Sequence, residues 1–351
     1  MIGRDDLSAA VRAGIISESQ AISIMTLAVS RREEAKCLKP IEEPFKIFNG
    51  LNEIFIVVGL GILTLGWYST SLLFIGSRGF EQIPILSFAS AVFIWLLCEY
   101  FIRHRRMLAP AIILSLLWTG NASLGFSFSY AEIFMIIQQD YSSLLMPIGL
   151  TMLSLLVFWW RFALPFVMVL IALGTFSFAL LLTAVQTDTP ATAMNIFLLS
   201  REGPFAWVTL AVGICVFAVA MWFDMSDPYR ITRRSDQGFW LHIVAAPVLT
   251  NTFALSLIEQ ETVVSNLLLL LVLAVISLVS VIIDRRSFLI SSAGYCVALS
   301  IMVFDEFFAG GIFLGLGVFL LTFGSFWERI RCQVILLLKP VLPIKHLPPT
   351  I

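Results

Sequence analysis

Residues 239–252 of this 351-residue chain read FWLHIVAAPVLTNT. They belong to the charge-free stretch 237–258, which contains one histidine, His242, and one proline, Pro247. A helix of about 20 apolar residues crosses the roughly 30 Å hydrocarbon core of a bilayer. Because lipid offers no partner to backbone N–H and C=O groups, a stretch in that core has to be helical. The sequence therefore predicts a transmembrane helix here, and the chain around it repeats the same pattern.

Composition indicates that a bilayer is the solvent for most of the chain. Hydrophobic residues make up 59% of it and charged residues 13%, and the mean hydropathy is +0.95. Soluble domains carry about 45–50% apolar and about 25% charged residues. With a net charge of -1 and no basic patch, no nucleic-acid partner is expected. Five isolated cysteines, three histidines and no catalytic motif predict no disulfide, no metal site, no cofactor and no enzyme activity.

Ten charge-free stretches after residue 53 are long enough to span a bilayer. The shortest, 82–98, lies at the lower limit of about 17 residues and is expected to continue past Glu99. We therefore predict an all-α fold: a polytopic membrane helical bundle of about ten transmembrane helices at 51–328, between a region at 1–50 and a tail at 329–351. The predicted spans are 54–77, 82–98, 107–131, 141–160, 162–187, 203–223, 237–258, 262–283, 287–304 and 307–327.

Basic residues set the orientation of this bundle. With ten spans, all of the 22 Lys and Arg residues except Arg78 and Arg201 fall on one side of the membrane. The positive-inside rule makes that side cytoplasmic. Adding or losing one helix would scramble this alternation, so it is a second argument for ten. Both termini are predicted to be cytoplasmic, with the tail lying on the membrane surface.

The N-terminal region predicts a short helical hairpin followed by a charged linker. A first helix over 5–13 would end at Gly14, and Ser17 would cap a second helix together with Gln20, three residues later. The hairpin is either a solvated lead-in to the membrane or a docking module for a protein partner. The apolar residues expected to cover one another are Leu7, Val11, Ile15, Ile22, Met25 and Val29.

Charged residues at predicted cytoplasmic helix ends form the candidate binding site. Glu53 opens the first span, and Arg285 follows the eighth. Glu99 and Arg103 are four residues apart, about one helical turn, so they can pair. If these helices bundle together, the side chains ring a shallow cavity; the alternative is that each is an interfacial anchor. No span carries a charge near its midpoint, which argues against a proton pump built on a buried carboxylate.

The seventh span adds His242 and Asn251 to this list. A histidine inside an apolar span needs a hydrogen-bond partner, because burying it alone costs about 1–3 kcal/mol. Pro247 has no N–H, so it leaves the carbonyl of Ile243 free. Asn251 and Asn121 both lie about 20 Å along their helices. They would either bond each other across a helix interface or line an outer-leaflet pocket.

Several short segments of the chain resemble a known family. They are Asn52-Glu53-Ile54-Phe55, residues 239–247, and Asp284-Arg285-Arg286 with Gly294-Tyr295. The chain resembles a family of uncharacterised multi-pass bacterial membrane proteins, and its hairpin at 5–31 is similar to theirs. The resemblance covers most of the chain and implies a bacterial inner-membrane location. It implies no activity.

Three functions are compatible with this pattern. Ten helices with both termini inside, one of them kinked by a proline near its middle, are typical of a transporter, permease or flippase. The second hypothesis is a non-catalytic membrane scaffold or sensor that presents the hairpin to a cytoplasmic or membrane partner. The third is a lipid-directed enzyme that uses Glu99, His242 and nearby arginines on a headgroup, although no nucleophile is identifiable. Membrane lipid is a partner in all three.

Overall fold

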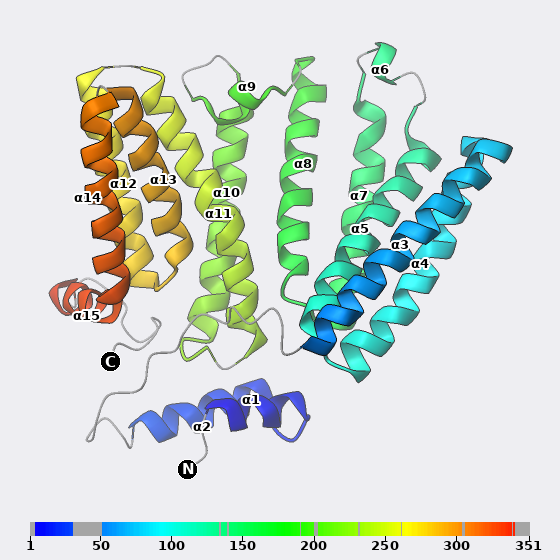
Figure 1. Ribbon diagram of the computed structural model, residues 1–351, viewed down its shortest axis with the longest axis horizontal. Coiled ribbons are helices and arrows are strands. Elements are labelled where there is room, and N and C mark those ends of the chain that lie inside the picture. The colour runs from blue at the N-terminus through cyan, green and yellow to red at the C-terminus, as the bar shows by residue number, and fades with distance from the viewer. Residues whose placement is uncertain are drawn as a thin grey trace. The chain divides into compact units, whose positions relative to one another are not determined.

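The computed structural model describes most of the chain as helix. The residues described are 4–30, 51–132, 135–138, 140–189, 191–199, 203–230, 232–260, 262–303, 306–338 and 340, and every regular element within them is helical. The chain divides into two compact units. Unit 1 combines residues 1–43 with 192–351, and unit 2 comprises 44–191. The helices of both units are drawn in Figure 1.

Eight of the described helices are long and apolar enough to cross a membrane, so the chain is a helical multi-pass membrane protein. Each coincides with one of the first eight predicted spans. The last two predicted spans coincide with α13 (Arg286–Val303) and α14 (Glu306–Ser325), which are not among the eight. The eight run over Asn52–Arg78, Phe80–His104, Leu108–Tyr130, Ser142–Phe162, Val167–Thr187, Phe205–Ser226, Arg233–Ile258 and Val263–Ile283.

Unit 2 is built around an aromatic core. Its main helices are α3 (Leu51–Arg78), α4 (Ile83–Cys98), α5 (Leu108–Tyr130), α7 (Leu145–Phe162) and α8 (Val167–Thr187). The rings of Trp95, Trp118, Phe158 and Phe162 pack against one another in tilted and edge-on arrangements, with centroids 4.7–6.3 Å apart. The α4 helix continues as a π-helix over Glu99–His104, which confirms that this span extends past Glu99.

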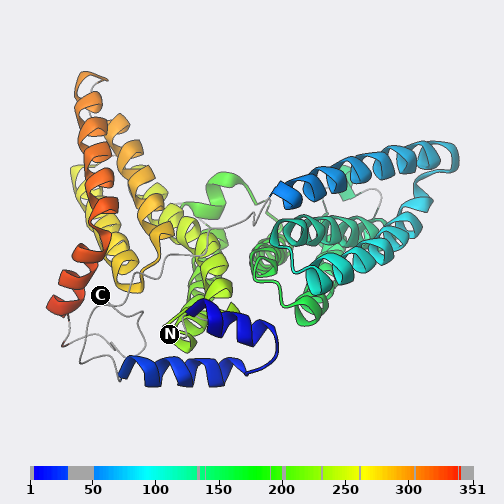
Figure 2. The same cartoon turned by 60° about the horizontal axis from the view of Figure 1, so that its bottom comes forward.

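Unit 1 is built around α11 (Arg233–Ile258). This helix packs against α10 (Phe205–Ser226), α12 (Val263–Ile283) and α13. In an 18-residue apolar stretch of this helix, 56% of the residues are buried, against 11–39% in the corresponding stretches of the other seven candidate spans. The short helix α9 (Ala193–Phe197) and the residues after it are bound to α11, because the Ser256 hydroxyl donates to the Phe197 carbonyl at 3.2 Å and accepts from the Leu199 N–H at 2.7 Å. After α14 the chain forms α15 (Trp327–Leu338). Figure 2 shows α15 from another side.

The N-terminal hairpin of unit 1 folds largely as predicted. Its helices are α1 (Arg4–Arg12) and α2 (Glu18–Ser30). The Ser17 N–H donates to Gln20 Oε1 at 2.8 Å and the Gln20 N–H donates to Ser17 Oγ at 3.2 Å, so the capping box is confirmed. The prediction for Ile15 is wrong: it is 75% exposed, and the next residue, Ile16, packs inward instead. Gly14 turns the chain with a φ of 73°, which sets this register.

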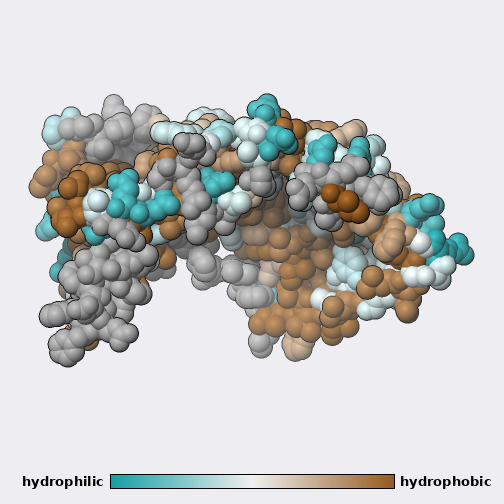
Figure 3. Space-filling view, turned by 90° about the horizontal axis from the view of Figure 1, so that it is seen from above, coloured by the Kyte–Doolittle hydropathy of each residue, from teal (hydrophilic) through white to brown (hydrophobic). Residues whose placement is uncertain are grey.

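Large apolar side chains cover much of the helix surface that faces away from the cores. Phe55, Leu65 and Leu73 on α3 are each at least 70% exposed, and so is Val263 at the start of α12. Figure 3 shows broad hydrophobic areas on one face, with the hydrophilic residues gathered in separate patches. Acyl chains would cover such surfaces in a bilayer.

Candidate functional site

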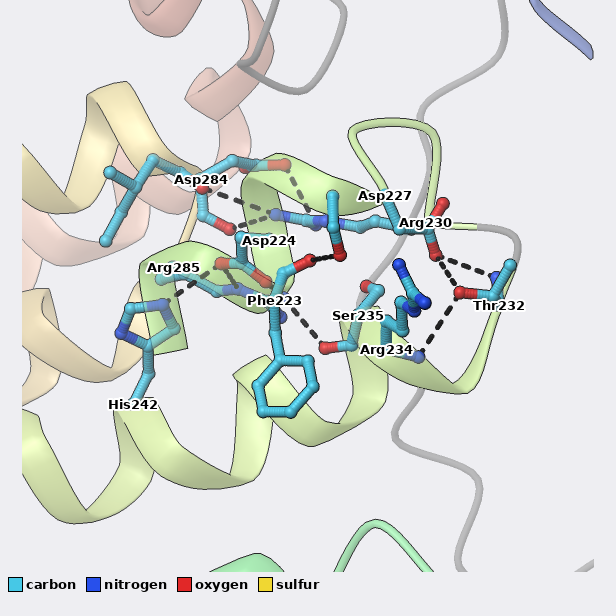
Figure 4. Close-up of polar contacts among 12 residues, drawn as sticks. Phe223, Asp224, Asp227, Arg230, Thr232, Arg234, Ser235, His242, Asp284 and Arg285 are labelled. Atoms are coloured by element: carbon cyan, nitrogen blue, oxygen red, sulfur yellow. Dashed lines mark hydrogen bonds and ion pairs between the residues drawn. The ribbon is translucent and has the colours of Figure 1, made fainter. Parts of the chain in front are cut away.

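A buried carboxylate, Asp224, lies at the centre of the most polar cluster described in unit 1. It belongs to the last turn of α10, which runs on to Ser226 rather than ending at 223 as predicted. Arg285 donates to it from Nη2 to Oδ1 at 2.5 Å and from Nε to Oδ2 at 2.9 Å. This is the two-pronged arrangement in which arginine binds carboxylate most strongly. Arg285 also donates to the Ser235 carbonyl at 3.0 Å, and Figure 4 shows the three residues converging from separate segments.

A glycine on α11 makes room for this carboxylate. A Cβ atom at Gly238 would overlap Asp224 Oδ1 and would lie 3.1 Å from Asp224 Cγ and 3.2 Å from the carbonyl oxygen of Ala220. Any larger residue at 238 would push α10 and α11 apart or displace the carboxylate. The close approach of α10 to α11 therefore depends on glycine at this position.

His242 completes the Asp224 cluster from one turn further along α11. Its ring is fully buried, and its Nε2 lies 3.0 Å from Asp224 Oδ2. Because the carboxylate accepts, Nε2 carries the hydrogen. The rings of Phe217 and Phe288 stand edge-on to it, with centroids 5.5 and 5.7 Å away. Its Nδ1 has no hydrogen-bond partner among the described residues. A neutral ring that donates from Nε2 is the form that fits this site.

A second carboxylate, Asp284, joins α12 to α15 and to the loop after α10. It ends α12 in a left-handed conformation with a φ of 57°. Its Oδ2 lies 3.0 Å from Arg230 Nη1, and its carbonyl accepts from Arg230 Nη2 at 2.7 Å. Its Oδ1 accepts from Trp327 Nε1 at 2.7 Å and lies 3.9 Å from Arg331 Nε. Burial lowers the pKa of Arg331, and the charge of Asp284 partly opposes that shift.

The loop between α10 and α11 links these ion pairs to the hairpin. Asp227 Oδ2 accepts from the Thr232 N–H at 2.8 Å and from its hydroxyl at 2.9 Å, and Thr232 in turn caps α11. Between these two residues, Tyr229 packs against the hairpin core of Leu7 and Ala21. Arg234, at the start of α11, pairs with Glu18 of α2 at 3.6 Å.

The whole group, which we call the buried ion network, has balanced charge. Its three carboxylates are equal in number to its three guanidinium groups, and a neutral His242 adds nothing to the sum. The side chains that form ion pairs within this group are at most 16% exposed. Burying paired charges in this way leaves no net charge in the low-dielectric interior. Among the described residues, no three His, Cys, Asp or Glu side chains converge as metal ligands. The members are Asp224, Asp227, Arg230, Asp284, Arg285, Arg331 and His242.

The six residues predicted as a binding site fall in both units. Arg285 and His242 meet at Asp224, as described above. The predicted pair of Glu99 and Arg103 is confirmed at 3.4 Å, and Arg161 binds the same carboxylate at 2.7 Å. Glu53 is buried in the first turn of α3, in unit 2. The sixth residue, Asn251, lies in unit 1.

Asn251 and Asn121, predicted either to bond each other or to line a pocket, each bond a tyrosine within their own unit. Asn251 Oδ1 accepts from the hydroxyl of Tyr295 on α13 at 2.6 Å, within unit 1. Asn121 Nδ2 donates to the hydroxyl of Tyr68 on α3 at 2.8 Å, within unit 2. Asn121 also borders a cavity of about 530 Å³ along α4 and α5.

In comparisons with known proteins, no family model, no curated protein and no solved structure matches the chain. The fold defines the class as a helical multi-pass membrane protein. Its particular role has to be inferred from the buried ion network and the hairpin.

Proposed function

We propose that the chain spans a bacterial inner membrane ten times, with both termini in the cytoplasm. The eight candidate spans agree with the first eight predicted ones, and α13 and α14 occupy the positions of the other two. The bias of Lys and Arg toward one side supports the orientation. The family resemblance supports the bacterial inner membrane. In this topology the hairpin, the buried ion network and α15 all lie at the cytoplasmic side.

We further propose that the protein is a non-catalytic sensor or scaffold, in which the cytoplasmic hairpin is coupled to the membrane bundle. One observation carries this proposal: Tyr229 packs into the hairpin core, while its neighbours in the same loop, Asp227 and Arg230, belong to the buried ion network. A partner that pulls on the hairpin therefore acts on a loop whose other contacts hold the ends of α10, α11 and α12.

Hydrogen exchange in lipid nanodiscs tests this coupling. The Tyr229→Ala variant should speed exchange in α1 and α2, and also in the peptides that contain Asp224 and Asp284. Asp224→Asn should also speed exchange in the hairpin, although residue 224 does not contact the hairpin. Tyr130→Ala, which removes an exposed tyrosine from unit 2, is the matched control. Unchanged hairpin exchange in Asp224→Asn would refute the coupling and with it the sensor role.

A transporter is the second candidate, because one observation favours it. Asp224 and His242 are ionisable groups inside candidate spans, and such groups commonly mark ion or proton routes. Neither of two sizeable cavities, of about 530 and 390 Å³, is lined by either residue. Proteoliposomes loaded with a pH-sensitive dye distinguish the two functions. Proton flux that His242→Ala abolishes, in a variant that still folds, would favour transport over sensing.

A further inference from the structure

A cavity of about 390 Å³ lies along α12, α13 and α14 and is bordered at one end by α15. Its walls are apolar apart from two serines, Ser277 and Ser292. The lining comes from the last half of α12, the first turns of α13, the last turns of α14 and the inner face of α15. Representative lining residues are Leu273, Leu278, Ala293, Phe319, Phe323 and Ile330.

The length of this cavity matches one leaflet of a bilayer. Its α12 wall runs from Leu270 to Val281, which is about 17 Å at a rise of 1.5 Å per residue. Half of a roughly 30 Å hydrocarbon core is about 15 Å. Because α12 is a candidate span, a groove of this length on its surface is filled by acyl chains rather than by water.

Two exposed arginines stand at the α15 end of the cavity. Arg286 lies on the same face of α13 as the lining residues Leu289 and Ala293, three and seven positions further on. Its guanidinium lies 5.4 Å from the ring of Trp327, which in turn is 5.6 Å from the ring of Phe323 in the cavity wall.

On α15, Arg329 directly precedes the lining residue Ile330 and lies over the ring of Phe326 at 5.7 Å. Arg331 is turned inward to Asp284 and belongs to the buried ion network. Glu328 is also exposed, so Arg286, Arg329 and Glu328 together leave one net positive charge at the α15 end of the groove. Either guanidinium group can donate charge-assisted hydrogen bonds to a phosphate at this end of the groove.

We propose that this groove binds an anionic glycerophospholipid, with an acyl chain in the cavity and its phosphate at Arg286 and Arg329. Basic groups beside helix grooves on the cytoplasmic face are suited to anionic headgroups. The α15 helix, with Trp327, Arg331 and Ile335 buried and Leu336 and Leu337 exposed, has the character of an interfacial helix. This site goes beyond the proposed sensor role and needs only the membrane topology.

Native mass spectrometry tests the site on the full chain. The protein is released from nanodiscs that contain equal amounts of phosphatidylglycerol and phosphatidylcholine, and the retained lipids are counted. The wild type should retain phosphatidylglycerol preferentially. In the double variant Arg286→Gln/Arg329→Gln this preference should fall roughly 25-fold, since each arginine near the surface contributes about fivefold. Both side chains are exposed, so the fold should be unaffected.

Two further variants separate the groove from general surface charge. Arg105→Gln/Arg106→Gln removes two exposed arginines from unit 2 and should leave the preference unchanged. Ala293→Phe fills the groove and should reduce retention of both lipids. Equal retention of the two lipids by the wild type, or an equal loss in the unit 2 control, would overturn the proposal. Displacement of the lipid by inorganic phosphate alone would also overturn it, because the acyl chain would then contribute nothing.

Discussion

Removing the Asp224 carboxylate should be among the most destabilising single changes in unit 1. The Asp224→Ala variant leaves the Arg285 guanidinium fully buried without its carboxylate partner, and it removes the partner of His242 Nε2. Breaking a buried ion pair by removing one partner costs about 3–5 kcal/mol. This is a large part of the 5–15 kcal/mol that stabilises a typical folded protein.

An exposed ion pair in unit 2 is the matched control. Glu99 pairs with Arg161 at 2.7 Å, but both side chains are about 30% exposed. Such pairs contribute about 0–1 kcal/mol because water already solvates the separated charges. Glu99→Ala should therefore cost at most about 1 kcal/mol. A second control replaces both partners of the buried pair. Asp224→Leu/Arg285→Leu leaves no buried charge at the pair and should recover most of the lost stability.

Equilibrium unfolding in mixed micelles measures these differences, and hydrogen exchange assigns them to a unit. Asp224→Ala should lower the free energy of unfolding and speed exchange in α10 to α13, while α3 to α8 keep their protection. If Asp224→Ala costs no more than Glu99→Ala, the carboxylate is effectively solvated and the buried ion network does not hold the bundle together. If the double variant is as unstable as the single one, the cost is one of packing rather than of unpaired charge.

Other positions give independent tests. Gly238→Ala should cost about 1–3 kcal/mol by unfolding in micelles, because the new methyl group meets Asp224. Ser17→Ala should cost about 1 kcal/mol through loss of the cap and speed exchange in α2 but not in α12. The Ser142 N–H lowers the pKa of Asp140 below its usual 3.8. That contact is therefore present above pH 3.8 and lost as the pH falls through the lower, folded value. Amide exchange at Ser142 should follow this change, and Asp140→Asn should remove it.

The helices could be predicted from the sequence because lipid leaves the backbone no alternative. Charge-free runs therefore located the eight candidate spans to within a few residues. The hairpin cap was predictable for a similar reason, since Ser17 and Gln20 interact within one turn. The prediction for Ile15 failed because this residue lies in the turn. The positive φ of Gly14 redirects the chain there, so helical periodicity no longer tells which side chain points inward.

The site was predictable only in part. His242 and Arg285 were selected because each is polar at the edge of an apolar run. Asp224 was missed because cutting at charged residues placed it outside the span that it belongs to. One sequence signal would have identified Asp224: an acidic residue at the end of one span is followed by a histidine one turn inside the next span. Equal depth along two helices does not identify the partners of Asn251 and Asn121, and each bonds a tyrosine of its own unit.

The loop after α10 shows why the hairpin and the bundle are expected to act together. Arg230 has a left-handed φ of 52°, a conformation that costs a non-glycine residue roughly 1–2 kcal/mol. A linker without such contacts would relax to a negative φ at this residue. The contacts of Arg230 with Asp284 therefore help to hold the left-handed conformation. Tyr229, the preceding residue, is held by the hairpin core. In the proposed sensor, a movement of the hairpin that shifts Tyr229 would change the backbone at Arg230 and, through Asp284, would reach Trp327 on α15.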